Sequence, residues 1–198
     1  MKMRCMFIFV ISAVSLACAA PPKSQNEILA HFFGYAETIR GIQIHNMMTL
    51  TINFVQHVVD SVPAEHRGPG TASLQAYANK GKSLRLTGTT GEKYMYIYEL
   101  QQVFEGLNDK LSQSAPESQV IGMSLLGLLG VSTEFATEDE HLHNKFVEGA
   151  TKMKAKLTSA TIDRESELFN AINEYIASTD IQQHEPLFVK IMSFKSRF

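Results

Sequence analysis

Glutamates and histidines are most dense between residues 138 and 143. Glu138 and His141 are three residues apart, as are Glu140 and His143. Di-metal sites in helical bundles use this Glu-x-x-His spacing, but they need it on two separate helices. None of the other five histidines has a glutamate three residues before it. We therefore expect acidic residues that stabilise a helix start and histidines that are solvated, rather than a metal site.

No other group of residues has the composition and spacing of a catalytic site. Gly81-Lys82-Ser83 resembles the end of a phosphate-binding loop, but Ala76 stands where this motif requires a glycine. The sequence contains no Gly-x-Ser-x-Gly nucleophile turn. We therefore expect a non-catalytic protein without a bound metal or cofactor.

The most apolar part of the chain after its N-terminus extends from Val120 to Val131 and contains no charged residue. It has three interpretations. The favoured one is a central helix that is buried on all sides. The second is the wall of a cavity for an apolar ligand, since methionine and leucine adapt well to apolar molecules. The third is insertion into a membrane after a conformational change.

If the stretch forms a cavity wall, its larger side chains and nearby aromatic rings are the candidate ligand-binding residues. These are Met123, Leu125, Leu126, Leu129, Phe104 and Phe54. As a helix the stretch is about 18 Å long, at about 1.5 Å per residue. Because a bilayer core is about 30 Å thick, we expect no stable membrane span.

The N-terminus has the layout of a secretory signal peptide. Lys2 and Arg4 precede an apolar run, and Ala17-Cys18-Ala19 then offers a small-residue cleavage site. We expect residues 1–19 to be a signal peptide and residues 20–198 to be one helical domain, secreted or periplasmic. An uncleaved anchor and a lipoprotein with lipidated Cys18 are the alternatives.

Removal of the signal peptide changes both the redox chemistry and the charge of the chain. Both cysteines lie in the first 18 residues, so the mature chain has none and must be stabilised by packing alone. The formal charge falls from −2 to −4, because two basic residues and no acidic residue are removed. This acidic balance argues against nucleic acid and against strongly anionic membranes as partners.

Apolar residues recur with helical spacing through most of the mature chain. Helices are expected at about 25–60 and 71–86, and further helices are expected to begin near residues 90, 116, 138, 162 and 186. Capping boxes of a serine or threonine followed three residues later by glutamate mark four starts. They are Ser24/Glu27, Thr89/Glu92, Ser114/Glu117 and Thr137/Glu140. The fold class is all-α, a single-domain bundle of about six or seven helices.

The absence of a catalytic motif favours a secreted, non-catalytic helical binding protein. Its expected partner is an apolar small molecule or lipid, held around Val120–Val131. The alternative is a secreted interaction or structural protein that recognises an extracellular protein, or a second copy of itself, through a helix face. Ile97–Leu111, with its regular apolar spacing, is the candidate face for that alternative, although a core role for it is favoured.

Overall fold

The computed structural model describes residues 24–107, 109–112 and 114–198 of the 198-residue chain. These residues form α-helices and short 3₁₀ turns, and no strand. The predicted signal peptide lies outside them. The helices are α1 (Gln25–Ser61), α2 (Pro69–Thr87), α3 (Thr90–Leu107), α4 (Pro116–Ser124), α5 (Leu128–Lys154), α6 (Ser159–Arg164), α7 (Ser166–Ala177) and α8 (Ile181–Met192).

Two of the junctions between helices contain no loop. Glu165 alone separates α6 from α7, and α4 leads directly into α5 through the 3₁₀ turn η2 (Leu125–Gly127). With one of these junctions counted as continuous, the described residues form seven helical rods, and with both counted so they form six. The prediction of an all-α bundle of about six or seven helices is therefore confirmed.

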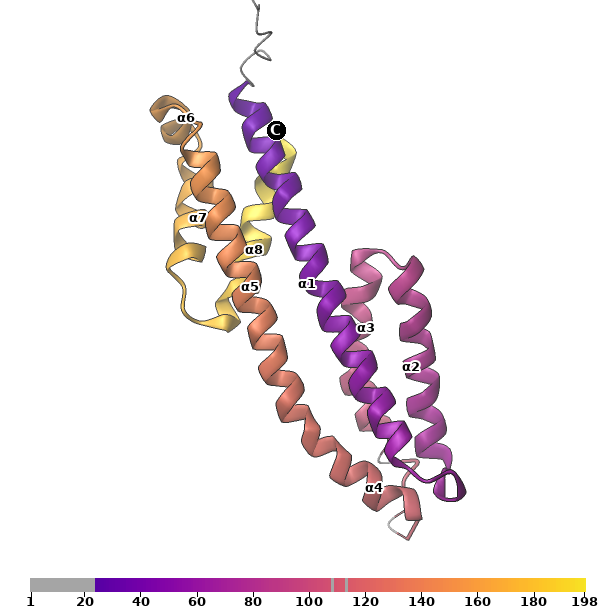
Figure 1. Ribbon diagram of the computed structural model, residues 1–198. Helices are drawn as coiled ribbons and strands as arrows, with labels where there is room; N and C mark the ends of the chain where they lie inside the picture. The colour runs from indigo at the N-terminus through magenta and orange to yellow at the C-terminus, as the bar shows by residue number, and fades with distance from the viewer. Residues whose placement is uncertain (1–23, 108, 113) are drawn as a thin grey trace, which may run out of the picture.

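The long helix α1 runs along the whole molecule, and the other helices pack around its two ends (Figure 1). Its C-terminal half packs with α2 and α3. Helix α5 then returns antiparallel to α1 and leads to α6, α7 and α8 beside the start of α1 (Figure 1). The C-terminus consequently lies near the beginning of α1.

Two of the predicted capping boxes start their helices as expected. The Ser24 amide donates to the Glu27 carboxylate at 2.7 Å, and the Glu27 amide donates to the Ser24 hydroxyl at 3.2 Å. Thr89 and Glu92 make the same reciprocal pair at 2.8 and 3.2 Å. These bonds satisfy amides that have no partner within the helix.

The predicted box of Ser114 and Glu117 is wrong. The carboxylate of Glu117 is buried and accepts hydrogen bonds from the amides of Gly68, Gly70 and Thr71 at 2.7, 3.0 and 2.9 Å. It therefore caps α2 instead of its own helix. A carboxylate is favourable there, because the N-terminus of a helix carries partial positive charge.

The predicted box of Thr137 and Glu140 is also wrong, because no helix begins there. Helix α5 continues through this segment, and the Thr137 hydroxyl donates to the carbonyl of Thr133 at 3.1 Å. A threonine in a helix interior commonly makes this bond to the preceding turn. The acidic run from Glu138 to Glu140 is therefore in the middle of a helix and does not stabilise a helix start.

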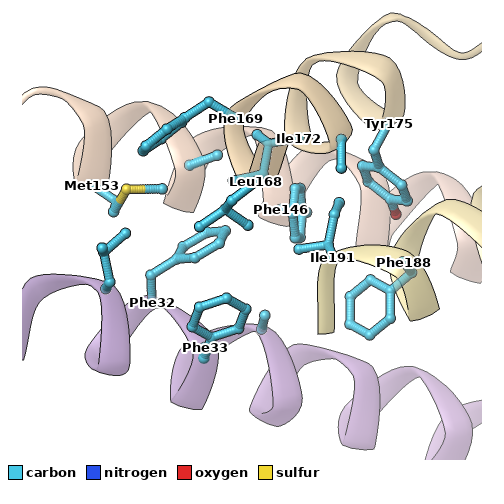
Figure 2. Packing of buried hydrophobic residues seen from close by; sticks show 14 residues of the cluster. Phe32, Phe33, Phe146, Met153, Leu168, Phe169, Ile172, Tyr175, Phe188 and Ile191 are labelled. Carbon is cyan, nitrogen blue, oxygen red and sulfur yellow. The ribbon is translucent and has the colours of Figure 1, made fainter. Parts of the chain in front are cut away.

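The buried apolar residues form two clusters along α1. The first core joins the N-terminal half of α1 to α5, α7 and α8 through an aromatic group (Figure 2). In it Phe146 contacts Phe32 edge to face at 5.3 Å between ring centroids, and it contacts Tyr175 at 4.6 Å. The second core joins the C-terminal half of α1 to α2, α3 and α4.

The expectation that Val120–Val131 is buried on all sides is wrong. Within this stretch only Ile121 is fully buried. Met123, Leu126 and Leu129 are 65%, 72% and 77% exposed. The stretch lies at the outer side of the second core, because α1, α2 and α3 already fill the centre of that core with their own side chains.

Candidate functional site

An apolar groove of about 910 Å³ lies between α1, α3, α5 and α8, and it is the strongest candidate for a binding site. It is situated where α5 passes from the second core to the first. Ligand sites in helical bundles commonly form between facing helices. The lining residues are Arg40, Gln43, Ile44, Met47, Tyr94, Ile97, Tyr98, Leu100, Gln101, Phe104, Glu105, Leu128, Val131, Ser132, Phe135, Ala136, Asp139, Ile181 and Glu185.

Most of this lining is aliphatic or aromatic. Met47 of α1, Phe104 of α3 and Phe135 of α5 line the groove from three helices. These residues are partly exposed, so the groove presents apolar surface to solvent. Phe104 packs edge to face on Phe54 of the second core, with ring centroids 6.3 Å apart.

Arg40 provides the polar part of the groove. Its guanidinium donates to Gln43 of the same helix and to the carboxylate of Glu185 on α8. It also lies over two aromatic rings, with its central carbon 5.6 Å from the Tyr94 centroid and 5.8 Å from that of Phe188. Arg40 thus connects α1 to α3 and α8 through charge and through cation–π contact.

Tyr94 of α3, which lies under Arg40, is paired with a second tyrosine of the same helix. The Tyr94 hydroxyl donates to the Tyr98 hydroxyl at 2.9 Å, and both residues line the groove. Burial, followed by the hydrogen bond with Tyr98, raises the pKa of Tyr94 above its ordinary value. Tyr94 is therefore a neutral phenol at physiological pH, and it offers hydrogen bonds without charge.

The groove carries more negative than positive charge. Arg40 is the only basic residue of the lining, whereas Glu105, Asp139 and Glu185 are acidic. The charge of Arg40 is already matched by Glu185. A ligand carboxylate would have to displace that pair and approach two further carboxylates, so the lining favours ligands without negative charge.

Behind the groove, Asp139 holds His184 in the interior. The Asp139 carboxylate accepts from Nδ1 of His184 at 2.5 Å, and the Ser178 carbonyl accepts from Nε2 at 3.2 Å. The two contacts hold the His184 ring between Asp139 of α5 and the end of α7.

His143 stacks on His184, with ring centroids 4.9 Å apart, and on Tyr175 at 5.2 Å. Burial, with a contribution from nearby His184, lowers the pKa of His143. Among the residues that the structure describes, neither Nδ1 of His143 nor the hydroxyl of Tyr175 has a hydrogen-bond partner. The neutral form of His143 is therefore favoured in the fold.

The predicted ligand-binding residues are only partly brought together. Phe104 lines the main groove, and Phe54 lies behind it. Phe54 and Met123 line a second, more open hollow of about 530 Å³ between α1 and the junction of α4 with α5. Leu125 packs against the second core. Leu126 and Leu129 line neither space and are exposed to solvent.

The residues considered for a metal site point in different directions from α5. The Glu138 carboxylate accepts from the Asn46 amide at 2.9 Å, while Glu140 and His141 are exposed. No group of three or more potential ligands among histidine, cysteine, aspartate and glutamate occurs within the described part of the chain.

Arg40, Asp139 and Glu185 are not identifiable as site residues from the sequence. Each is an ordinary polar residue in its own helical segment, and the three are brought together by packing between α1, α5 and α8. Only a weak signal points to Arg40, because it is the only basic residue between Gln25 and Ser61 and stands in a largely apolar helix.

Comparisons of the chain with protein-family models, curated protein sequences and solved structures gave no match.

Proposed function

We propose that this chain is a secreted, non-catalytic carrier of an apolar small molecule or lipid. The observation that supports the proposal is the groove between α1, α3, α5 and α8, whose volume of about 910 Å³ is in the range of small-molecule sites. A set of partly exposed apolar side chains from four helices gives such a ligand a surface to bury. The predicted signal peptide supports secretion.

The ligand that suits this lining has an apolar body and a neutral polar group. The body lies along Met47, Phe104 and Phe135, and the polar group is directed to the hydroxyls of Tyr94 and Tyr98. An alcohol or amide fits this end better than a carboxylate, given the acidic residues around it. Hydrophobic burial then supplies affinity, and the hydroxyls fix the orientation.

The test uses N-phenyl-1-naphthylamine, a neutral apolar dye that fluoresces when it leaves water. We expect the secreted protein to increase its fluorescence, and retinol to displace it at concentrations at least tenfold lower than oleate. Ala136→Phe fills the groove from α5, so it should weaken dye binding at least tenfold. Ala72→Phe, at an exposed position of α2 outside the groove, is the matched control.

Three results would contradict the proposal. The first is an absence of dye binding at micromolar protein. The second is equal binding by the Ala136→Phe variant and wild type. The third is a natively secreted protein that is repeatedly free of bound molecules in native mass spectrometry. Superimposable circular dichroism spectra of the two variants verify that the substitution changes the groove and not the fold.

The alternative, recognition of a macromolecule through Ile97–Leu111, receives less support from the geometry. Leu100 and Leu107 are buried, and the remaining apolar residues of that series pack against the second core. This series therefore contributes to the second core, and its members Ile97, Leu100 and Phe104 also line the proposed ligand groove.

A further inference from the structure

An exposed row of apolar side chains follows the junction of α4 and α5. It consists of Met123, Leu126 and Leu129, which we call the apolar strip. The residues are three apart, and the 3₁₀ turn η2 lies in the middle of the row. Residues three apart are aligned in a 3₁₀ helix. The turn therefore helps to bring the three side chains onto one side, where an α-helix would spread them further round its axis.

The opposite side of the same segment is attached to the protein. Ile121 is buried in the second core, and Leu125 and Leu128 pack against that core. The segment is consequently apolar all round its axis, although only one side is covered. A helix of this kind is expected inside a protein or in contact with lipid. Apolar surface of this type marks an interaction site.

The apolar segment is mostly uncovered. The continuous helix from Pro116 to Lys154 contains an apolar window of 18 residues, of which only 6% is buried. A helix that lies in the plane of a bilayer surface buries its exposed apolar side in the lipid without crossing it. Among the described residues this is the one helix that is long and apolar enough to cross a membrane.

Polar side chains beside the apolar strip bond within their own helix. The Ser132 hydroxyl donates to the Leu128 carbonyl at 3.0 Å, and the Thr133 hydroxyl donates to the Leu129 carbonyl at 3.1 Å. Hydrocarbon offers no hydrogen-bond partner, so a surface that meets lipid must satisfy its polar groups internally. A protein partner would instead use free polar groups to fix its orientation.

We propose that the apolar strip docks the protein on the surface of a neutral lipid bilayer. No charged residue occurs between Glu117 and Glu134, and both of these flanking charges are acidic. Anionic lipids attract surfaces flanked by lysine and arginine, which this segment lacks. Phosphatidylcholine and other lipids without net charge are therefore the expected surface.

The docking surface and the groove use different sides of the same helical segment. Leu128 and Val131 line the groove from the same turns of helix, but they point to the side that packs on the second core, away from Leu126 and Leu129 of the apolar strip. The same stretch of helix therefore contributes one side to the proposed ligand site and the other side to the strip. The docking inference does not depend on the groove being occupied, since it rests on the exposed side of the helix.

The chain contains no tryptophan, so a single introduced tryptophan reports on its own surroundings. We expect Leu126→Trp to show a blue shift and increased emission with phosphatidylcholine vesicles. Leu86→Trp is the matched control, because Leu86 is 79% exposed on α2, far from the strip in sequence. Its emission should not change with the same vesicles.

Vesicle flotation of the secreted protein provides the second measurement. We expect the double variant Leu126→Ser/Leu129→Ser to bind phosphatidylcholine vesicles at least about tenfold more weakly, because burying one leucine is worth a factor of that order. Leu86→Ser should bind like wild type. Addition of phosphatidylserine should not strengthen binding.

Absence of vesicle binding by the wild type, or equal binding by the double variant, would overturn the docking proposal. If the double variant instead abolishes a concentration-dependent dimer seen in light scattering, the strip is a self-association surface and the lipid proposal is wrong. The dye experiment is carried out without vesicles, so it tests the groove independently of lipid docking. Loss of vesicle binding with normal dye binding removes lipid docking alone, and the reverse result removes the carrier function alone.

Discussion

Tyr77 of α2 and Tyr96 of α3 are joined reciprocally, each hydroxyl donating to the backbone carbonyl of the other residue. The two bonds measure 2.6 and 3.2 Å, and the rings stack with centroids 4.2 Å apart. Both side chains are buried in the second core. The pair thus fixes the distance and the rotation between the two helices, in addition to filling space.

Tyr77→Phe should lower the free energy of unfolding by about 1 kcal/mol, since it removes one buried hydrogen bond while the ring remains. Urea denaturation followed by circular dichroism measures the change. Tyr98→Phe on α3 is the control, because Tyr98 is 59% exposed and its hydrogen bond with Tyr94 is a surface bond. It should change stability by less than about 0.5 kcal/mol. Equal losses in the two variants would show that the reciprocal bonds contribute nothing specific.

Gly81→Ala should be destabilising by about 1–3 kcal/mol, the usual cost of overpacking a core. A Cβ at Gly81 would clash with the ring and hydroxyl of Tyr96 and with Ile52. Gly34→Ala on α1 is the control, since a Cβ there meets nothing within 4 Å. It should stabilise the protein by about 0.5–1 kcal/mol, because glycine weakens a helix interior. In thermal denaturation, the midpoint temperature should fall for Gly81→Ala and rise for Gly34→Ala.

Glu117 should make the protein sensitive to acid. Burial alone would raise the pKa of its carboxyl, but hydrogen bonds from Thr71, Gly70 and Gly68 outweigh burial and hold the pKa below its ordinary value of 4.5. The stabilisation is therefore complete above about pH 4.5 and is lost as pH falls through the lowered pKa.

Glu117→Gln should reduce stability by about 2 kcal/mol at pH 7, because an amide oxygen replaces the charged acceptor. The difference between wild type and variant should shrink as pH falls from 5 to 3. Denaturant titrations at several pH values measure it. Glu65→Gln, at an exposed position, is the control. A difference that stays constant down to pH 3 would contradict the role given to the charged carboxylate.

Protonation of His143 should lower the stability of the fold at a higher pH than protonation of Glu117 does. Its pKa is lowered from 6.5 by burial and by His184, so the unfolded chain binds a proton more readily than the fold does. Stability contributed by the neutral imidazole is present above about pH 6.5 and decreases as pH falls toward the lowered pKa. The slope from this one group cannot exceed about 1.4 kcal/mol per pH unit.

His143→Phe keeps an aromatic ring in the stack and removes the titration. Denaturation at pH 5.5 and pH 7.5 should show a smaller loss of stability on acidification in the variant than in wild type. The exposed His141→Phe substitution on the same helix is the comparison. If it reduces the pH dependence as much as His143→Phe does, then burial of His143 is not the cause.

Capping and packing differ in how far the sequence alone predicts them. Ser24 with Glu27 is a local pattern, and the structure realises it because both partners belong to one helical turn. Ser114 with Glu117 is equally good as a pattern. Its glutamate is used by Gly70 and Thr71, almost fifty residues earlier in the chain. A local sequence pattern cannot show that amides distant in the chain will bind the same carboxylate.

The residues of the groove were likewise only partly predictable, because many of them meet through contacts between distant parts of the chain. Phe104 was predicted as a wall residue from its aromatic side chain, and it lines the groove. Arg40 and Glu185 are 145 residues apart, and their pairing depends on the position that α8 takes beside α1. The exposure of Leu126 and Leu129 was unpredictable for a related reason. Hydropathy gives the preference of a segment for burial, but the space in the core is already taken by other helices.

If the chain is secreted and the predicted signal peptide is removed after Ala19, the mature N-terminus should be Ala20. Intact-mass measurement and N-terminal sequencing of protein from the medium check this. An N-terminus at Met1 would indicate an uncleaved anchor, and a lipid-modified Cys18 would indicate a lipoprotein. Either result would overturn the prediction that the mature chain lacks cysteine.

The division of α1 between two cores has a consequence for the order of folding. The second core is closed by short connections between α1, α2 and α3, and closing short loops is fast. The first core joins Phe32 and Phe33 to Phe146 and to residues near the C-terminus. If the chain is exported from its N-terminus, as the predicted signal peptide implies, the apolar face around Phe32 and Phe33 should emerge first and be covered last. A chaperone on the receiving side would then find that face uncovered throughout translocation.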